Sequence, residues 1–283
     1  MSKVWIETAE ITGALMNADD AKISVFDHGF TVGDGVFETV KTVDGVPFAL
    51  EQHLTRLEHS ARTLKMSPPN LESVSRAVNS VCSQTEVSHG VGRLRITWTS
   101  GVGVLGSERG KSWTLVVAWA PATAWPATAK LEISNVKRNQ HSPLSGAKTT
   151  SYAENALAIA EAKAAGADEA LLLNLDEKIC EGASSNIFIV KDSHIMTPPA
   201  SDGCLVGVTR NLVLDVARQH FDVMERSISL QELFGADEVF ITSSTRDIQP
   251  VAAVGNQEYS GRRPVTTELM RLFAQSAEEN FNV

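Results

Sequence analysis

A segment rich in proline and small residues constrains the organisation of this 283-residue chain more than any other feature. Residues 120–130 read APATAWPATAK, and this composition is typical of a connection rather than of a helix or strand interior. The length of the chain also favours two domains over one. The sequence therefore predicts a smaller domain over 1–119, a linker over 120–130 and a larger domain over 131–283.

The first predicted domain alternates between two hydrophobic periods. Apolar residues recur at helical spacing over 54–64 and again over 71–81, and two prolines separate these runs. Arg93 and Arg95 then alternate with apolar residues, which predicts a strand with one polar face. A glycine-rich connection leads to a second strand over 113–120. These elements indicate an α+β domain.

The second predicted domain mixes strands and helices without a repeat period, which indicates an α/β class. Strands are expected at 131–136, 170–175, 186–190 and 237–244, and helices at 151–166, 209–220 and 265–280.

Charge and cysteine content limit the classes of partner. A net charge of −9 with scattered basic residues argues against nucleic acid or an anionic membrane surface. The three cysteines, Cys82, Cys180 and Cys204, lack the paired spacing of a metal site, and their odd number does not suggest a disulfide framework. The N-terminus lacks a secretory signal pattern, and no stretch of eighteen apolar residues occurs. We therefore expect a cytoplasmic protein without a metal site.

Lys148 is the first candidate for chemistry. It lies among small residues in SPLSGAKTTSYAEN, with Tyr152 one helical turn downstream. A lysine amine forms Schiff bases with aldehydes and does so best when partly desolvated. A solvated surface lysine is the alternative interpretation.

Glu181 lies between two strand-like runs, where an exposed charge would be unusual. A carboxylate there could hold a proton on a heterocyclic nitrogen and so make that ring an electron sink, because a buried carboxylate needs a partner. The alternative is a carboxylate that flanks a hairpin.

Two segments suit a phosphate group. In LVGVTR, Gly207, Val208 and Thr209 stand at a predicted helix start, where N–H groups and the helix dipole favour an anion. In TSSTRD, residues 242–247, a strand ends in hydroxyl-bearing residues. Arg56 lies beside the apolar stripe of its helix, where either a phosphate ligand or a solvated arginine is plausible.

Seven segments together resemble the fold-type IV pyridoxal-phosphate (PLP) enzymes, the class IV aminotransferase family. They occur in the family's order and read FDHGFTVGDGVFET, HLTRLEHSA, KTTSYAEN, GADEALLLN, CEGASSNIFIV, TPPASDGCLVGVTR and ADEVFITSSTRDIQPV. The resemblance implies a D-amino-acid aminotransferase-like PLP fold of the α/β class, with a small α+β domain, a larger barrel-like α/β domain and the cofactor between them. It also implies a homodimer whose partner chain completes the pocket.

The same resemblance assigns roles to residues. Lys148 matches the lysine that binds the cofactor aldehyde, and Glu181 matches the carboxylate facing the pyridine nitrogen. Cofactor binding extends to Arg56, Tyr152, Val208, Thr209 and Ser244. Ser244 and Thr245 fall where relatives present backbone N–H groups to the substrate carboxylate, and Phe30 falls where some relatives carry a tyrosine.

Departures from each branch bear on the reaction. D-amino-acid aminotransferases carry an Arg-x-His pair where this chain has Leu105 and Ser107, and branched-chain enzymes carry Tyr-x-Arg where it has Arg93-Leu94-Arg95. Two arginines suit a substrate with two carboxylates, although both could pair with acidic neighbours instead. KTTSYAEN and CEGASSN are most similar to 4-amino-4-deoxychorismate lyase, which releases pyruvate and gives 4-aminobenzoate for folate synthesis. The sequence therefore predicts this lyase first, with a branched-chain or D-amino-acid aminotransferase as the alternative and a non-catalytic PLP-binding protein as a remote one.

Overall fold

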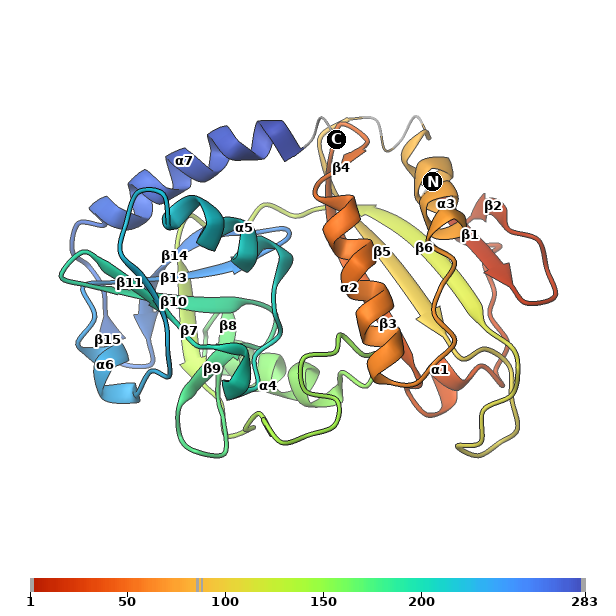
Figure 1. Ribbon diagram of the computed structural model, residues 1–283, viewed down its shortest axis with the longest axis horizontal. Helices are drawn as coiled ribbons and strands as arrows, with labels where there is room; N and C mark the ends of the chain where they lie inside the picture. The colour runs from red at the N-terminus through yellow and green to blue at the C-terminus, as the bar shows by residue number, and fades with distance from the viewer. Residues whose placement is uncertain (1–2, 85–86, 88, 281–283) are drawn as a thin grey trace. The chain divides into compact units, whose positions relative to one another are not determined.

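The computed structural model describes residues 3–84, 87 and 89–280. The chain forms two compact units (Figure 1). Unit 1 combines the residues up to Thr123 with Ala147–Tyr152, and unit 2 combines Ala124–Gly146 with the residues from Ala153 onward. Each unit is built on one sheet with helices packed on it, so the predicted mixed α/β class is confirmed.

Unit 1 is built on a six-stranded antiparallel sheet in the order β2-β1-β6-β5-β3-β4. Helix α2 packs on β3, and α3 packs on β6 and β1. The strands are β1 Lys3–Thr8, β2 Ala14–Asn17, β3 Gly35–Val43, β4 Val46–Pro47, β5 Val91–Thr99 and β6 Thr114–Pro121, and the helices are α1 His28–Thr31, α2 Leu50–Thr63 and α3 Leu71–Cys82.

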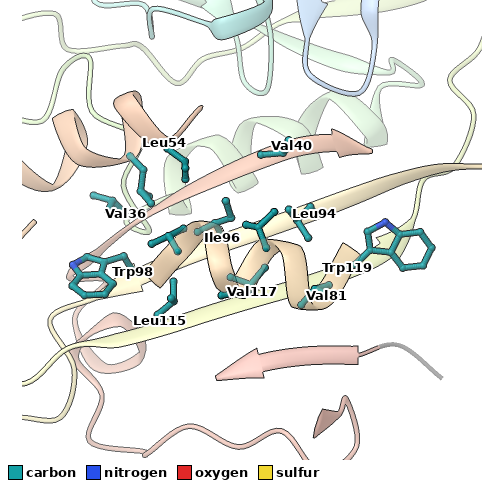
Figure 2. Close-up of a cluster of buried hydrophobic side chains, with 14 of the residues drawn as sticks. Val36, Val40, Leu54, Val81, Leu94, Ile96, Trp98, Leu115, Val117 and Trp119 are labelled. Atoms are coloured by element: carbon teal, nitrogen blue, oxygen red, sulfur yellow. The ribbon is translucent and has the colours of Figure 1, made fainter. Parts of the chain in front are cut away.

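The core of unit 1 lies between the sheet and these two long helices (Figure 2). Leu94, Ile96 and Trp98 of β5 point into it, while Arg93 and Arg95 stay exposed on the opposite face. The alternation predicted for this strand is therefore confirmed. The other side chains labelled in the figure come from β3, β6, α2 and α3, and they are Val36, Val40, Leu115, Val117, Trp119, Leu54 and Val81.

Strand β3 was not expected from the sequence. The apolar residues of GVFETVKTV do not alternate cleanly, because the strand is buried on both faces along most of its length. Glu38 and Lys41 are among its buried residues. A central strand with buried charges follows neither the alternating pattern of a half-exposed strand nor the continuous apolar run of a buried one.

Unit 2 is built on a nine-stranded mixed sheet in the order β12-β11-β10-β13-β14-β7-β8-β9, with β15 paired to β14. Helices α5 and α7 both pack on β13, and α4 packs on β7 and β8. The strands are β7 Ala129–Ile133, β8 Glu169–Leu173, β9 Ile179–Gly182, β10 Asn186–Lys191, β11 His194–Thr197, β12 Val223–Glu225, β13 Glu238–Ser243, β14 Asp247–Val254 and β15 Gln257–Glu258. The helices are α4 Ala153–Ala164, the 3-10 turn η1 Ala200–Asp202, α5 Val208–Ala217, α6 Leu230–Phe234 and α7 Pro264–Asn280.

The segment 147–152 belongs to unit 1, whereas the predicted boundaries put Lys148 in the second domain. Hydrogen bonds to β3 explain the difference. The Phe37 N–H donates to the Lys148 carbonyl at 2.9 Å, and the Thr150 N–H donates to the Gly35 carbonyl at 2.8 Å. A helix long and apolar enough to cross a membrane does not occur in the part of the chain that the structure describes.

Candidate functional site

Lys148 lies half-buried in unit 1 against two aromatic rings. Its Nζ is 4.5 Å from the centroid of the Phe37 ring and 5.6 Å from that of Tyr152. The two rings meet edge to face at 5.3 Å. The Lys148 main-chain N–H donates to Ser60 Oγ on α2 at 3.1 Å. The lysine amine is therefore held at a defined place beside aromatic surface, as a nucleophilic amine requires.

Arg95 reaches the same aromatic ring from β5. Its Cζ lies 3.4 Å from the Phe37 centroid, and its Nη1 donates to Thr39 Oγ1 at 3.3 Å. Protein atoms around the guanidinium lower the pKa of Arg95 to about 10, although the residue stays exposed overall. Arg93 stands two residues earlier on the same face, opposite Lys41 of β3. Arg95, rather than Arg93, is thus the arginine that shares a ring contact with Lys148.

Arg56 is held by a buried carboxylate that the sequence did not reveal. Arg56 Nε and Nη2 both donate to Glu38 at 2.8 Å, and the Nδ1 of His53 lies 2.7 Å from Glu38 Oε2. Burial raises the pKa of the Glu38 carboxyl, but Arg56 and His53 lower it more, so that the net pKa lies well below its usual range. Burial also lowers the pKa of His53, and the charges of Arg56 and Lys148 add to this effect.

Replacing Glu38 with glutamine is expected to reduce the free energy of unfolding by about 3–5 kcal/mol, because it removes one partner of a buried ion pair. Glu38 is completely buried. Glu232 is the matched control: its pKa is also lowered, to about 2, but its side chain is 41% exposed. Glu232→Gln should therefore cost less than about 1 kcal/mol. Equal losses in urea denaturation of the two variants would contradict the role given to Glu38.

The same groups set a pH dependence. The lowered pKa of His53 means that the unfolded chain takes up its proton first, so stability falls as the pH drops through about 6.5. The lowered pKa of Glu38 gives stability that is present above about 4.5 and is lost below it. Both groups therefore make the folded protein less stable as the pH falls. We expect the wild-type midpoint of urea denaturation to fall steadily from pH 7 to pH 4, and the fall below pH 4.5 to be smaller in Glu38→Gln.

Glu181 lies buried in β9 of unit 2, where both of its carboxylate oxygens accept hydrogen bonds. Arg138 Nε donates to Oε1 at 3.1 Å, and the Leu205 N–H donates to Oε2 at 2.9 Å. An arginine and a backbone donor together favour the ionised form of a carboxylate and fix its plane. Glu181 is therefore a buried carboxylate with a fixed orientation.

The loop after Leu205 leads into helix α5, whose first residues are Val208 and Thr209. Gly207 precedes the helix and has no side chain with which to cap it. A Cβ at position 207 would lie 2.1 Å from Asn186 Oδ1, so any larger residue would displace the Asn186 side chain. Asn186 also donates from Nδ2 to the Leu205 carbonyl at 2.8 Å. The carboxylate of Glu181 and the start of α5 are thus tied to one loop, within unit 2.

Asn186 also connects this loop to the predicted turn after β13. Asn186 pairs in register with Thr242, two residues before Ser244. The turn closes with a bond from the Arg246 N–H to the Ser243 carbonyl at 3.1 Å, so Ser244 and Thr245 occupy its tip. Both tip residues are half-buried.

The structure therefore groups the predicted residues within each unit. In unit 1, Lys148, Tyr152 and Arg95 gather around Phe37, and Arg56 lies on α2 one turn from Ser60. In unit 2, Glu181, the start of α5 and the turn after β13 gather around Asn186. Sequence reasoning missed the residues that hold these groups in place, which are Phe37, Glu38, His53, Arg138 and Asn186. Phe37, Glu38, His53 and Asn186 lie inside the segments that carry the family resemblance, whereas Arg138 lies outside all of them.

Comparison with known proteins identifies the family. The model of "Amino-transferase class IV" matches residues 35–254. A branched-chain-amino-acid aminotransferase of Pseudomonas aeruginosa is 32% identical over 92% of this chain and 90% of its own. An aminodeoxychorismate lyase of Bacillus subtilis is 26% identical over 95% of this chain and 94% of its own. Among solved structures, a hypothetical aminotransferase from Mycobacterium tuberculosis in its PLP-bound form superposes with a TM-score of 0.86 at 25% identity, covering 97% of this chain and 99% of the other.

Proposed function

The chain belongs to the class IV aminotransferase family, whose members are PLP-dependent enzymes, and from this membership we propose that it is an amino-acid aminotransferase. The single observation that carries the proposal is the contact of Lys148 and Arg95 with one ring, that of Phe37. An amine for the cofactor and a cation for a carboxylate are thereby both held against the Phe37 ring. Two relatives above 30% identity, one named "Branched-chain-amino-acid aminotransferase" and the other "Putative branched-chain-amino-acid aminotransferase", support the reaction type.

Each unit offers side chains whose chemistry suits one part of PLP. Lys148 of unit 1 would bind its aldehyde, and the buried carboxylate of Glu181 in unit 2 would pair with its ring nitrogen. The start of α5, with Val208 and Thr209, offers backbone N–H groups to a phosphate, because Gly207 cannot cap them. When bound, PLP withdraws electrons from the substrate carbon that bears the nitrogen.

Further residues complete the proposed site. Arg56 adds a fixed guanidinium for the phosphate, since Glu38 holds its plane through Nε and Nη2. Ser244 would add a hydroxyl to the phosphate, and Tyr152, whose ring lies against Phe37, would approach the phenolic oxygen of the cofactor. Lys148, once released from the cofactor, would take the proton from the substrate carbon as general base.

The substrate would carry a second carboxylate, as glutamate and 2-oxoglutarate do. Arg95 and Lys148 both contact the Phe37 ring, so Arg95 would bind such a group, and a guanidinium can hold a carboxylate through two parallel bonds. Thr245 and Ser244 would receive the carboxylate next to the amine, and Phe30 would line the substrate side.

The 4-amino-4-deoxychorismate lyase predicted from the sequence is the second candidate. One observation favours it: Arg93 and Arg95 stand on the same exposed face of β5, two residues apart, so that two carboxylates on one ring could each meet an arginine. The lyase of Bacillus subtilis gives the reaction a precedent in the family.

One experiment separates the two reactions. The PLP-loaded enzyme is mixed with glutamate, with leucine or with aminodeoxychorismate, in each case without a 2-oxo acid acceptor. An aminotransferase should convert its cofactor stoichiometrically to the amine form with glutamate or leucine and then stop. Catalytic release of pyruvate from aminodeoxychorismate, with the aldehyde form retained, would identify the lyase and overturn the aminotransferase.

We also propose that the enzyme is a homodimer, with an apolar surface of unit 1 as its interface. This surface, here termed the loop patch, joins two loops, because His28 Nε2–H donates to the Val104 carbonyl at 2.9 Å and the Gly103 N–H donates to the Phe26 carbonyl at 3.2 Å. Phe30 is 69% exposed and Leu105 is 76% exposed. A cluster of large apolar side chains on a surface marks an interaction site. The loop patch consists of Ile23, Val25, Phe26, Phe30, Val32, Val102, Val104 and Leu105.

Sedimentation velocity tests the dimer. The wild type should sediment with twice the 30.5 kDa mass of the chain, and Leu105→Asp should shift the protein toward the monomer, because a carboxylate cannot be buried there without a partner. Ile11 is a matched control, since it is 63% exposed between β1 and β2, outside the loop patch. A monomeric wild type, or equal shifts in Leu105→Asp and Ile11→Asp, would contradict the proposed interface.

A further inference from the structure

The segment between β6 and β7 carries a tryptophan that contacts the turn after β13. Trp125 Nε1–H donates to Thr245 Oγ1 at 3.3 Å, and the Trp125 ring centroid lies 3.6 Å from Arg246 Cζ. The next residue, Pro126, accepts a hydrogen bond on its carbonyl from Gln249 Nε2 at 2.6 Å. All these residues belong to unit 2. A segment with the composition of a linker is therefore fixed at three points on one hairpin.

Arg246 presents a rigid surface to this tryptophan. Its Nη1 donates to Gln249 Oε1 at 2.6 Å, and its Nη2 donates to Glu169 Oε2 at 3.1 Å. The side chains of Arg246 and Glu169 are only 2% and 1% exposed. A buried ion pair contributes little net stability but restricts the conformations available to the groups around it. Arg246, at the end of the turn, is thus locked, and Trp125 covers its guanidinium face.

Of the two contacts that the Trp125 side chain makes, the hydrogen bond to Thr245 is the one without an evident role in stability. Residues 122–128 form no helix or strand, and Trp125 is half-buried. Stacking on Arg246 alone would cover the ion pair. The additional bond from the indole N–H orients the hydroxyl of Thr245 at the tip of the turn, next to Ser244.

We propose that Trp125 is a positioning residue for the substrate carboxylate, an inference that rests on the function proposed above. The indole fixes the tip of the turn through Thr245 and its base through Arg246. The backbone N–H groups and the hydroxyls of Ser244 and Thr245 are thereby held in the one arrangement that receives a carboxylate next to the reacting amine. Without the indole, the turn keeps its place in the sheet but loses the fixed orientation of its tip.

Binding of two non-reacting amines to the PLP-loaded enzyme tests this inference. 2-Aminoisobutyrate carries an amine and a carboxylate but no hydrogen on the carbon between them, and tert-butylamine has a methyl group in place of that carboxylate and also lacks such a hydrogen. Each is titrated against the absorbance of the bound cofactor. Trp125→Phe keeps a ring over Arg246 and loses only the N–H bond, so it should weaken binding of 2-aminoisobutyrate about fivefold, the equivalent of one net hydrogen bond, and leave binding of tert-butylamine unchanged. Trp125→Ala should weaken 2-aminoisobutyrate further.

Trp5→Phe is the matched control, because it also removes one indole bond, from Trp5 Nε1 to Glu7 Oε2 at 3.2 Å in unit 1. It should leave both titrations unchanged. Equal affinities of wild type and Trp125→Phe for 2-aminoisobutyrate would overturn the inference. So would a parallel loss for both amines, since that would indicate a general structural role. A wild-type protein that acquires no cofactor absorbance with PLP would instead overturn the proposed function itself.

Discussion

Lys148→Ala is expected to lower turnover by about 10⁴-fold or more, because the variant loses both the amine that binds the aldehyde and the general base. Borohydride treatment of the PLP-loaded wild type should fix the cofactor covalently to the peptide that contains Lys148, as measured by mass spectrometry. The variant should show no such label. Its fold should survive, because the main-chain bonds of residue 148 to Phe37 and Ser60 do not involve the ammonium group.

Lys163→Ala provides the control for this variant. Lys163 lies on α4 with its side chain 56% exposed and pairs only loosely with Asp168, at 3.9 Å. It should retain wild-type turnover and the label on Lys148. A label found on another lysine in the wild type would contradict the assignment of Lys148, and substantial turnover by Lys148→Ala would contradict its role as base.

Glu181→Gln is expected to slow turnover by about 10²- to 10³-fold, the range observed when one group that stabilises a transition-state charge is removed. An amide cannot hold a proton on the ring nitrogen as a carboxylate does. It would also turn an N–H₂ group toward either Arg138 or the Leu205 N–H, both of which donate to Glu181 in the wild type. The absorbance of the bound cofactor should therefore change in position while the cofactor stays bound.

The control for this substitution is Glu177→Gln, in the turn before β9, where the side chain is 62% exposed. It removes a carboxylate four residues away and should leave both turnover and the cofactor spectrum unchanged. Unchanged turnover in Glu181→Gln would remove the role given to its carboxylate. Loss of cofactor binding alone, with normal turnover at saturating PLP, would show that Glu181 serves affinity and not chemistry.

Local periodicity was sufficient to predict several elements. The two helices α2 and α3, the alternation along β5 and the strands β8 and β10 follow from the spacing of apolar residues. Strand β3 was missed because Glu38 and Lys41 are buried within it, which breaks the expected pattern of apolar residues. Strand β1 was also missed, although its residues Lys3–Thr8 partly alternate between buried and half-buried positions. The predicted helix ending at Gly166 exists as α4, and it begins two residues later than expected.

The candidate site could be predicted only as far as single residues and motifs allowed. Glu38 binds Arg56 and His53, which lie 18 and 15 positions away on α2, and no local pattern relates them. The contact of Trp125 with Thr245 spans 120 positions. Such pairs arise from the packing of elements and from sheet register, both of which depend on tertiary structure rather than on propensity. The roles of Lys148 and Glu181 came from the resemblance.

The route of the backbone has a practical consequence for anyone who wishes to study either unit alone. The chain completes most of unit 1, enters unit 2 at Ala124, returns for only the six residues Ala147–Tyr152, and leaves again. A truncated fragment that ends at Thr123 would lack the short stretch bonded to Gly35 and Phe37 and would expose those amide and carbonyl groups to water. To produce unit 1 alone, the six residues Ala147–Tyr152 would have to be joined to it again, for example in a circularly permuted gene, so that they can pair with β3.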